Sequence, residues 1–268
     1  MDVYGLIGTP IEHSLSPPMH EAAYEALDMD ARYVTFEPDP SDGARAVEAA
    51  ATLGLDGLNV TIPFKESVLD VVDPDPLAER IGAVNTVAFE DGRPVGYNTD
   101  ATGAVRALRD HAGALSGNAV VVGAGGAGRA ITVGLADAGL SVDVVNRTVE
   151  RAHEVAALVD DARGHGLDAL GSLVPEASVL VNATSVGMES SETPVPAKHL
   201  HADLTVLDAV YQPLETQLLS DAAAAGATTV DGGWMLLYQG VAAFEHWTGA
   251  DPPVDAMRQA LRADLTEN

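Results

Sequence analysis

Four glycines lie near the middle of the chain, between an apolar run at 119–122 and an expected helix at 127–138. They are Gly123, Gly125, Gly126 and Gly128. Glycine lets the backbone turn tightly and approach a phosphate closely. The N-terminus of the following helix offers free N–H groups and a positive dipole end. Because a second strand is expected at 141–145, the order indicates a pyrophosphate site rather than an ordinary turn without a ligand.

The end of that second strand indicates which dinucleotide binds. Asn146, Arg147 and Thr148 stand where a site for NAD usually places Asp or Glu for the ribose 2′-hydroxyl, and Arg151 follows one helical turn later. Two guanidinium groups can hold a 2′-phosphate through paired hydrogen bonds. The sequence therefore predicts NADP, and the alternative is that both arginines are solvated surface charges.

A second polar set follows an expected strand at 58–62. Alternation places Asn59 and Thr61 on one face of that strand, and Lys65 comes shortly after its end. An amide, a hydroxyl and an ammonium near one strand end suit a polyhydroxy or carboxylate ligand. A half-exposed strand would explain Asn59 and Thr61 alone, but the chain has only one other lysine, Lys198. Asp100 precedes an expected helix at 101–111, as an N-cap, a catalytic carboxylate or both.

Composition limits the class of protein and its partners. The chain has 268 residues, 47% of them hydrophobic, so it can form two domains with cores. Its net charge of -26 argues against nucleic-acid and anionic-membrane partners and indicates a cytoplasm rich in salt, where such charge is screened. The absence of cysteine, with a nucleotide site, predicts a cytoplasmic protein. There is no apolar run of membrane-spanning length. The eight histidines form no pattern of metal ligands, and we expect no metal.

Several segments together resemble the shikimate dehydrogenases. They are SLSP at 14–17, NVTIPFK at 59–65, GAVNT at 82–86, GYNTD at 96–100, NATSVGM at 182–188, VY at 210–211 and the stretch 232–239. The resemblance spans nearly the whole chain and keeps the order of the family. It implies reversible, NADPH-dependent reduction of 3-dehydroshikimate to shikimate, within aromatic amino-acid biosynthesis. Ser16, in place of the threonine that often accompanies quinate use, favours shikimate over quinate.

The resemblance assigns roles to individual residues. Lys65 is expected to transfer the proton and Asp100 to hold the lysine ammonium and the substrate hydroxyl in line. The residues expected to bind the substrate are Ser14, Ser16, Asn59, Thr61, Asn85, Thr99, Tyr211 and Gln239. Those expected to bind NADP are Gly123, Ala124, Gly125, Gly126, Ala127, Gly128, Asn146, Arg147, Thr148, Arg151, Thr184, Ala209 and Gly232.

The same resemblance implies an α/β fold with two domains. An N-terminal α/β substrate domain comprises 1–101 and 233–268, and a Rossmann-type doubly wound NADP-binding domain comprises 102–232. A homodimer is compatible with this reading, although the sequence does not fix the oligomeric state. Two alternatives stay open: a quinate/shikimate dehydrogenase of broader specificity, and a non-catalytic sensor that binds NADP.

Overall fold

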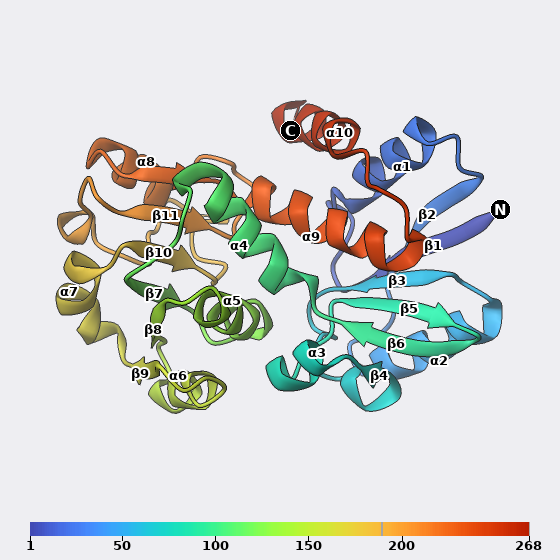
Figure 1. Cartoon of the computed structure of the whole chain (residues 1–268), viewed down its shortest axis with the longest axis horizontal. Helices are drawn as coiled ribbons and strands as arrows, with labels where there is room; N and C mark the ends of the chain where they lie inside the picture. The colour runs from blue at the N-terminus through green and yellow to red at the C-terminus, as the bar shows by residue number, and fades with distance from the viewer. Residues whose placement is uncertain (189, 268) are drawn as a thin grey trace. The chain divides into compact units, whose positions relative to one another are not determined.

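The chain folds into two compact units (Figure 1). The computed structural model describes residues 1–188 and 190–267. Unit 1 comprises Met1–Thr99 with Gln239–Asn268, and unit 2 comprises Asp100–Tyr238. We predicted that the domains change over after residues 101 and 232, whereas the units change over after Thr99 and Tyr238.

Unit 1 contains a six-stranded mixed sheet in the order β2-β1-β3-β5-β6-β4. Strands β1, β2 and β3 pair in parallel, β5 runs antiparallel to β3 and to β6, and β4 runs parallel to β6. The strands are β1 Asp2–Ile7, β2 Ala31–Phe36, β3 Gly57–Val60, β4 Asp73–Pro74, β5 Thr86–Glu90 and β6 Arg93–Tyr97. The β5–β6 hairpin turns at Asp91 and Gly92, which have φ values of 51° and 75°. This is the turn that an Asp-Gly pair predicts.

Helices pack against the sheet of unit 1 and against one another. Helix α10 packs against α1, and α1 packs against β2. Ile7, Leu58, Phe64 and Val68 are fully buried members of the core cluster. The helices here are α1 Ser16–Ala26, α2 Gly43–Leu53, α3 Pro76–Ile81 and α10 Val254–Glu267, and α9 Gly232–Thr248 contributes residues to both units.

Unit 2 contains a six-stranded parallel sheet in the order β12-β11-β10-β7-β8-β9. This is the strand order of a Rossmann-type domain. Strands β7, β10 and β11 are mostly apolar and buried, as expected for the centre of a parallel sheet covered by helices. The strands are β7 Asn118–Val122, β8 Ser141–Val145, β9 Ala162–His165, β10 Val179–Asn182, β11 Thr205–Asp208 and β12 Thr228–Val230.

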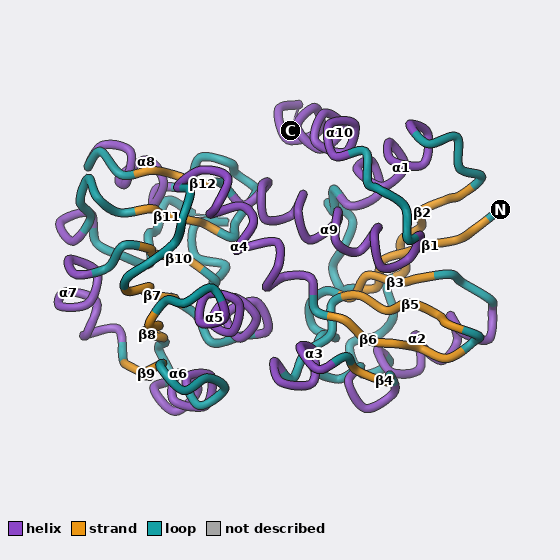
Figure 2. Tube along the Cα trace, viewed as in Figure 1, coloured by secondary structure: helices purple, strands orange, loops and turns teal. Residues whose placement is uncertain are grey.

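Strands and helices alternate along unit 2 (Figure 2). Helices α5 and α6 pack on β8, and α8 packs on β11 and β12. The helices are α4 Thr99–Ala112, α5 Gly126–Asp137, α6 Val149–Ala156, α7 Leu170–Leu173 and α8 Gln217–Ala224. In the part of the chain described, no helix combines the length and apolar character needed to cross a membrane.

Several predicted boundaries differ from the structure. The third strand ends at Val60 rather than Ile62, because the chain turns there and Pro63 has no N–H for the sheet. Ile62 is 72% exposed, so the predicted alternation does not continue to it. The sequence also predicts a helix that begins at Ser41 and another over 150–159, whereas α2 begins at Gly43 and α6 ends at Ala156. The short strands β4, β9 and β12 were not predicted.

Candidate active site

The glycine-rich turn joins β7 to α5 in the predicted place. Gly123 has a φ of 118°, and a Cβ there would lie 2.8 Å from the Ala183 carbonyl oxygen. A Cβ on Gly128 would lie 2.1 Å from the Gly123 carbonyl oxygen. The backbone of the protein itself therefore requires glycine at these two positions.

Gly125 has a different role in the same turn. It is the N-cap of α5, and a Cβ built on it would meet no atom within 4 Å. Open space thus lies beside the N–H groups that begin the helix, where an anion gains from the helix dipole. Ala124 lies in the turn and Ala127 in the first helical turn.

The two predicted arginines follow β8, Arg147 in the loop directly after the strand and Arg151 in α6. The backbone N–H of Asn146 donates to the His165 carbonyl oxygen at 3.1 Å, and Asn146 Nδ2 donates to the Thr148 carbonyl oxygen at 2.9 Å. Arg147 and Arg151 are exposed, and neither guanidinium has a hydrogen bond or ion pair with another described residue. In a chain with a net charge of -26, two unpaired cations at this strand end suit a phosphate.

A buried carboxylate ties together the loops after β10 and β11. Asp208 accepts hydrogen bonds from Thr216 Oγ1 at 2.7 Å, Asn182 Nδ2 at 2.8 Å and the Val210 N–H at 3.0 Å. Burial raises the pKa of Asp208, and the three hydrogen bonds oppose that rise. Asn182 Oδ1 in turn accepts from Thr184 Oγ1 at 2.7 Å, so this network fixes the predicted cofactor residue Thr184.

The loop after β11 lies close against the start of α9. A Cβ on Gly232 would lie 2.5 Å from the Val210 carbonyl oxygen and 2.7 Å from that of Ala209. Gly232 therefore permits a close approach of the helix to this loop. Tyr211, next along the loop, is partly buried, and burial raises the pKa of its phenol.

In unit 1, Asn85 bonds to two other predicted substrate residues, Thr99 and Gln239. Asn85 Oδ1 accepts from the Thr99 N–H at 2.7 Å, and Asn85 Nδ2 lies 3.0 Å from Thr99 Oγ1 and 3.5 Å from Gln239 Oε1. All three side chains are buried. The residues come from the start of β5, the start of α4 and α9, so the fold brings together positions far apart in sequence.

The amide of Asn59 belongs to the same network. Its Oδ1 accepts from the Tyr33 hydroxyl at 2.7 Å, and its Nδ2 lies 3.2 Å from Thr86 Oγ1 and 3.3 Å from the Asn85 carbonyl oxygen. Asn59 is 4% exposed. Both ends of the amide thus have protein partners, and Thr86 Oγ1 continues the chain to Thr99 Oγ1 at 3.2 Å.

The sequence predicts Ser16 as the N-cap of the helix that follows it and Asp100 as the N-cap of the helix at 101–111, and the structure corrects both predictions. Leu15, not Ser16, is the N-cap of α1, and the Ser16 N–H donates to Ser14 Oγ at 3.3 Å. Since Pro17 and Pro18 carry no N–H, few donors remain to be capped. Asp100 lies inside the first turn of α4, not at its cap, because Asn85 Oδ1 already accepts from the Thr99 N–H.

The segment with Lys65 is anchored on both sides. Thr61 donates its N–H to the Ile7 carbonyl oxygen at 2.9 Å, and Phe64, which is fully buried, donates its N–H to the Thr61 carbonyl oxygen at 2.9 Å. The Lys65 carbonyl oxygen accepts from the Val84 N–H at 2.7 Å, next to Asn85. The side chain of Lys65 is half-buried.

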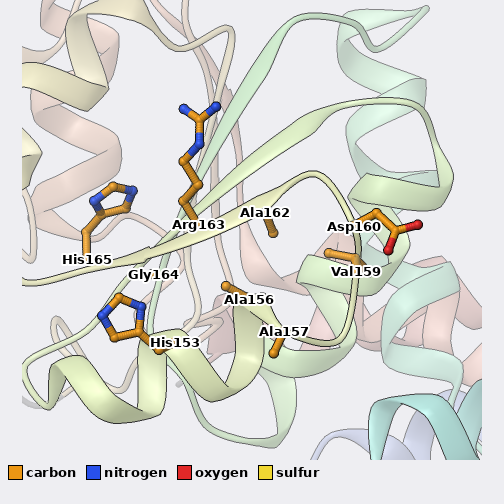
Figure 3. A pocket seen from close by; sticks show the side chains of 9 residues that line it. All are labelled: His153, Ala156, Ala157, Val159, Asp160, Ala162, Arg163, Gly164 and His165. Carbon is orange, nitrogen blue, oxygen red and sulfur yellow. The ribbon is translucent and has the colours of Figure 1, made fainter.

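A hollow of about 650 Å³ lies elsewhere in unit 2, between α6 and β9 (Figure 3). His153, Arg163 and His165 line it, and His165 Nε2 lies 2.8 Å from Asp143 Oδ1. It contains none of the predicted site residues, so the candidate site rests on the networks above. Among the described residues, no three His, Asp or Glu side chains gather in a way that could hold a metal ion.

Comparisons with known proteins agree with this geometry. Residues 6–87 match the shikimate dehydrogenase substrate binding domain, 107–202 match the shikimate / quinate 5-dehydrogenase model and 232–262 match the shikimate 5′-dehydrogenase C-terminal domain. A shikimate dehydrogenase (NADP(+)) from the halophilic archaeon Haloarcula marismortui is 71% identical over 99% of this chain and 100% of its own. The chain belongs to the shikimate dehydrogenase family.

Solved structures of the shikimate dehydrogenase family extend the likeness. The Thermus thermophilus shikimate 5-dehydrogenase, in complex with NADP(H) and shikimate, is 40% identical with a TM-score of 0.91, over 99% of this chain and 100% of that one. A quinate dehydrogenase from Corynebacterium glutamicum, in complex with NAD, is 33% identical with a TM-score of 0.91, over 98% of this chain and 99% of that one.

Sequence reasoning missed two residues that organise this member of the shikimate dehydrogenase family. Asp208 is the one charged residue in the apolar stretch 206–210, and that position is a signal for a buried carboxylate. Tyr33 carries no such signal, because it reads as an ordinary aromatic residue of a strand. Its role depends on partners that lie far away in the sequence.

Proposed function

We propose that this member of the shikimate dehydrogenase family catalyses the reversible, NADP-dependent reduction of 3-dehydroshikimate to shikimate, a step of aromatic amino-acid biosynthesis. The observation that carries the proposal is the pair of unpaired arginines that follow β8, Arg147 and Arg151, together with the open helix N-terminus that follows the neighbouring parallel strand β7. The full-length likeness to an NADP-dependent shikimate dehydrogenase supports it.

The chemistry requires a hydride at the ketone carbon and a proton at the ketone oxygen. NADPH supplies the hydride when bound. We assign the proton to Lys65 Nζ, which gives it to the oxygen in reduction and takes it from the hydroxyl in oxidation. To Asp100, which follows Thr99 directly in the first turn of α4, we assign the role of holding the ammonium and the substrate hydroxyl in line.

Substrate binding is assigned to hydroxyls and amides. Ser14 and Ser16 bind the carboxylate. The ring hydroxyls or the carboxylate are bound by Asn59, Thr61, Asn85, Thr99, Tyr211 and Gln239. A site of buried polar groups rejects an analogue that lacks a hydroxyl, because its own groups are then left unpaired.

NADP is assigned to the other domain. Residues 1–101 and 233–268 form the substrate domain, and 102–232 form the NADP domain. The glycine-rich turn, Gly123 to Gly128, would hold the pyrophosphate. The segment at the end of β8, Asn146 to Thr148, would hold the 2′-phosphate together with Arg151. Thr184, Ala209 and Gly232 complete the site.

The test is oxidation of NADPH with 3-dehydroshikimate in low and in multimolar KCl. NADH and 3-dehydroquinate are run beside it. Turnover that needs NADPH and 3-dehydroshikimate supports the proposal. Binding of NADP without turnover, from folded protein, would instead make the chain a sensor.

A broader quinate/shikimate dehydrogenase is the second candidate. The likeness to a quinate dehydrogenase favours it, because that structure matches over nearly the full chain. Comparable kcat/KM values for the two oxidised substrates would establish this alternative.

We also place the enzyme in the cytoplasm, on its lack of cysteine and its nucleotide cofactor. A homodimer is the oligomeric state we propose to test, by light scattering in multimolar KCl. A monomeric mass across the working concentration range would reject it.

A further inference from the structure

Tyr33, on β2, lies at the centre of the substrate-side network without belonging to any of the recognised segments. Its hydroxyl donates to Asn59 Oδ1 at 2.7 Å. The buried phenol therefore contacts a residue assigned to substrate binding. The ring is 5% exposed.

Aromatic packing holds the Tyr33 ring in one place. The His20 ring stacks on it with centroids 4.7 Å apart and planes 4° from parallel, and the Trp247 ring lies at 6.3 Å. Neither ring nitrogen of His20 has a partner among the described residues, and burial lowers its pKa to about 3. His20 is thus a neutral ring that packs against Tyr33, and the phenol hydroxyl has little freedom to move.

The donors and acceptors available on each side chain determine the direction of the hydrogen bonds that Tyr33 and Asn59 make. A phenol has one proton, and Asn59 Oδ1 can only accept, so that proton goes to Asn59. With Oδ1 held by Tyr33, Asn59 Nδ2 is the end that faces Thr86 Oγ1 and the Asn85 carbonyl oxygen.

The orientation of the Asn59 amide determines the directions of the other hydrogen bonds in this network. If the amide turned over, Oδ1 would face the Asn85 carbonyl oxygen, and two acceptors would lie 3.3 Å apart. Thr86 Oγ1 would then have to donate to Asn59 and lose its bond to Asn85 Oδ1, now 3.1 Å long. The change would reach Thr99, which Asn85 and Thr86 both contact.

We propose that Tyr33 is a positioning residue for substrate binding, which sets the orientation of the Asn59 amide and thereby the donors and acceptors presented by Asn85 and Thr99. The inference rests on the proposed function of this site. It concerns binding of the substrate only, because the cofactor residues lie in other segments of the chain.

The test is Tyr33→Phe, with Tyr24→Phe as the matched control. Tyr24 is also a buried tyrosine of unit 1, but its hydroxyl has no partner among the described residues. We expect Tyr33→Phe to raise KM for 3-dehydroshikimate roughly tenfold, with a smaller change in kcat, since a buried acceptor loses its donor. KM for NADPH should stay at the parental value, and Tyr24→Phe should change neither KM.

A double-mutant cycle separates positioning from simple loss of stability. In an Asn59→Ala background, where no amide remains to be oriented, Tyr33→Phe should add less than a twofold increase in KM. Full additivity, or a lower melting temperature with parental KM, would overturn the role of Tyr33. If the parent itself does not reduce 3-dehydroshikimate, the proposed function fails first. If the parent is active and Tyr33→Phe keeps the parental KM, only the role of Tyr33 fails.

Discussion

Asn59, Asn85 and Thr99 of unit 1 are linked by hydrogen bonds to one another or through Thr86, whereas Gly125, Arg147 and Arg151 of unit 2 face open space or solvent. Asn59, Asn85 and Thr99 are buried and take part in one network of neutral groups. Gly125 and Arg147 have no comparable neighbours. The difference indicates that substrate binding depends on an ordered set of donors and acceptors, while cofactor binding depends on backbone shape and unpaired positive charge.

The largest expected effect is on kcat, and it separates the proton-transfer step from the binding of substrate and of cofactor. Lys65→Ala should lower kcat by roughly 10²- to 10⁴-fold, the usual contribution of general acid–base catalysis. Binding of NADP and of shikimate, measured by calorimetry, should change far less. Lys198→Ala removes the other lysine, which is exposed, and serves as the control. Parental turnover in Lys65→Ala would remove this residue from the mechanism.

The next effect tests the cofactor side. Replacing Arg147 and Arg151 together by Gln should reduce the preference for NADP over NAD by roughly 100-fold, because a hydrogen bond to a charged group is worth about 1.5–3 kcal/mol. The comparison is kcat/KM with NADPH and with NADH. Activity with NADH should be retained, and Arg163→Gln, an exposed arginine on β9, should leave the preference unchanged. A loss of activity with both cofactors would argue against a 2′-phosphate site.

Acidification should change the stability contributed by His20 in unit 1 and by Asp208 in unit 2 in opposite directions. The folded-state pKa of His20 is about 3, against about 6.5 when unfolded, so the unfolded state binds more protons between these values. Stability from this residue is therefore lost as pH falls below 6.5, by roughly 1.4 kcal/mol per pH unit. Denaturant unfolding at several pH values should show that His20→Phe loses less stability on acidification than the parent. Parallel curves would contradict a buried neutral histidine.

Asp208 has the reverse sign. Burial raises its folded-state pKa above the ordinary value of 3.8, so the folded state binds more protons in the window between the two values. As pH falls through that window, the parent should gain stability relative to Asp208→Asn. The same denaturant series measures it. A relative loss of parental stability on acidification would show that the three hydrogen bonds outweigh burial.

The smallest expected effect is that of salt on the melting temperature, and it arises from the charge of the whole surface. With a net charge of -26, the melting temperature should rise with KCl and level off above about 1 M, where the Debye length is ~3 Å. The gain should appear with either cofactor bound, because it does not come from the site. A melting temperature independent of salt would remove the argument for a high-salt cytoplasm.

The sequence predicted best what depends on neighbouring residues. The glycine-rich turn and the Asp91–Gly92 hairpin occur as their residues predict. A glycine after the expected helix at 127–138 predicts a helix stop, and Gly139 has a φ of 94° just past the end of α5. The place of each motif on its strand or helix was also predictable, because spacing along the chain determines it.

What depends on distant partners could not be predicted. Ser16 was expected to cap α1, but Ser14 accepts its N–H instead, and Asn85 takes over the cap expected of Asp100. Tyr33 and Asp208 appear as organising residues only when strands far apart in sequence lie side by side. The predicted roles of the site residues and the domain boundaries stay predictions, to be tested by the variants above.

The most direct test of the account is a comparison of four reactions: shikimate and quinate, each with NADP and with NAD, in multimolar KCl. If one set of residues determines substrate specificity and another determines cofactor specificity, kcat/KM will be highest for shikimate with NADP. The preference for NADP will then be the same factor with either substrate. A preference for NAD or for quinate, or a cofactor preference that changes with the substrate, would contradict the division between a neutral network and a pair of free arginines.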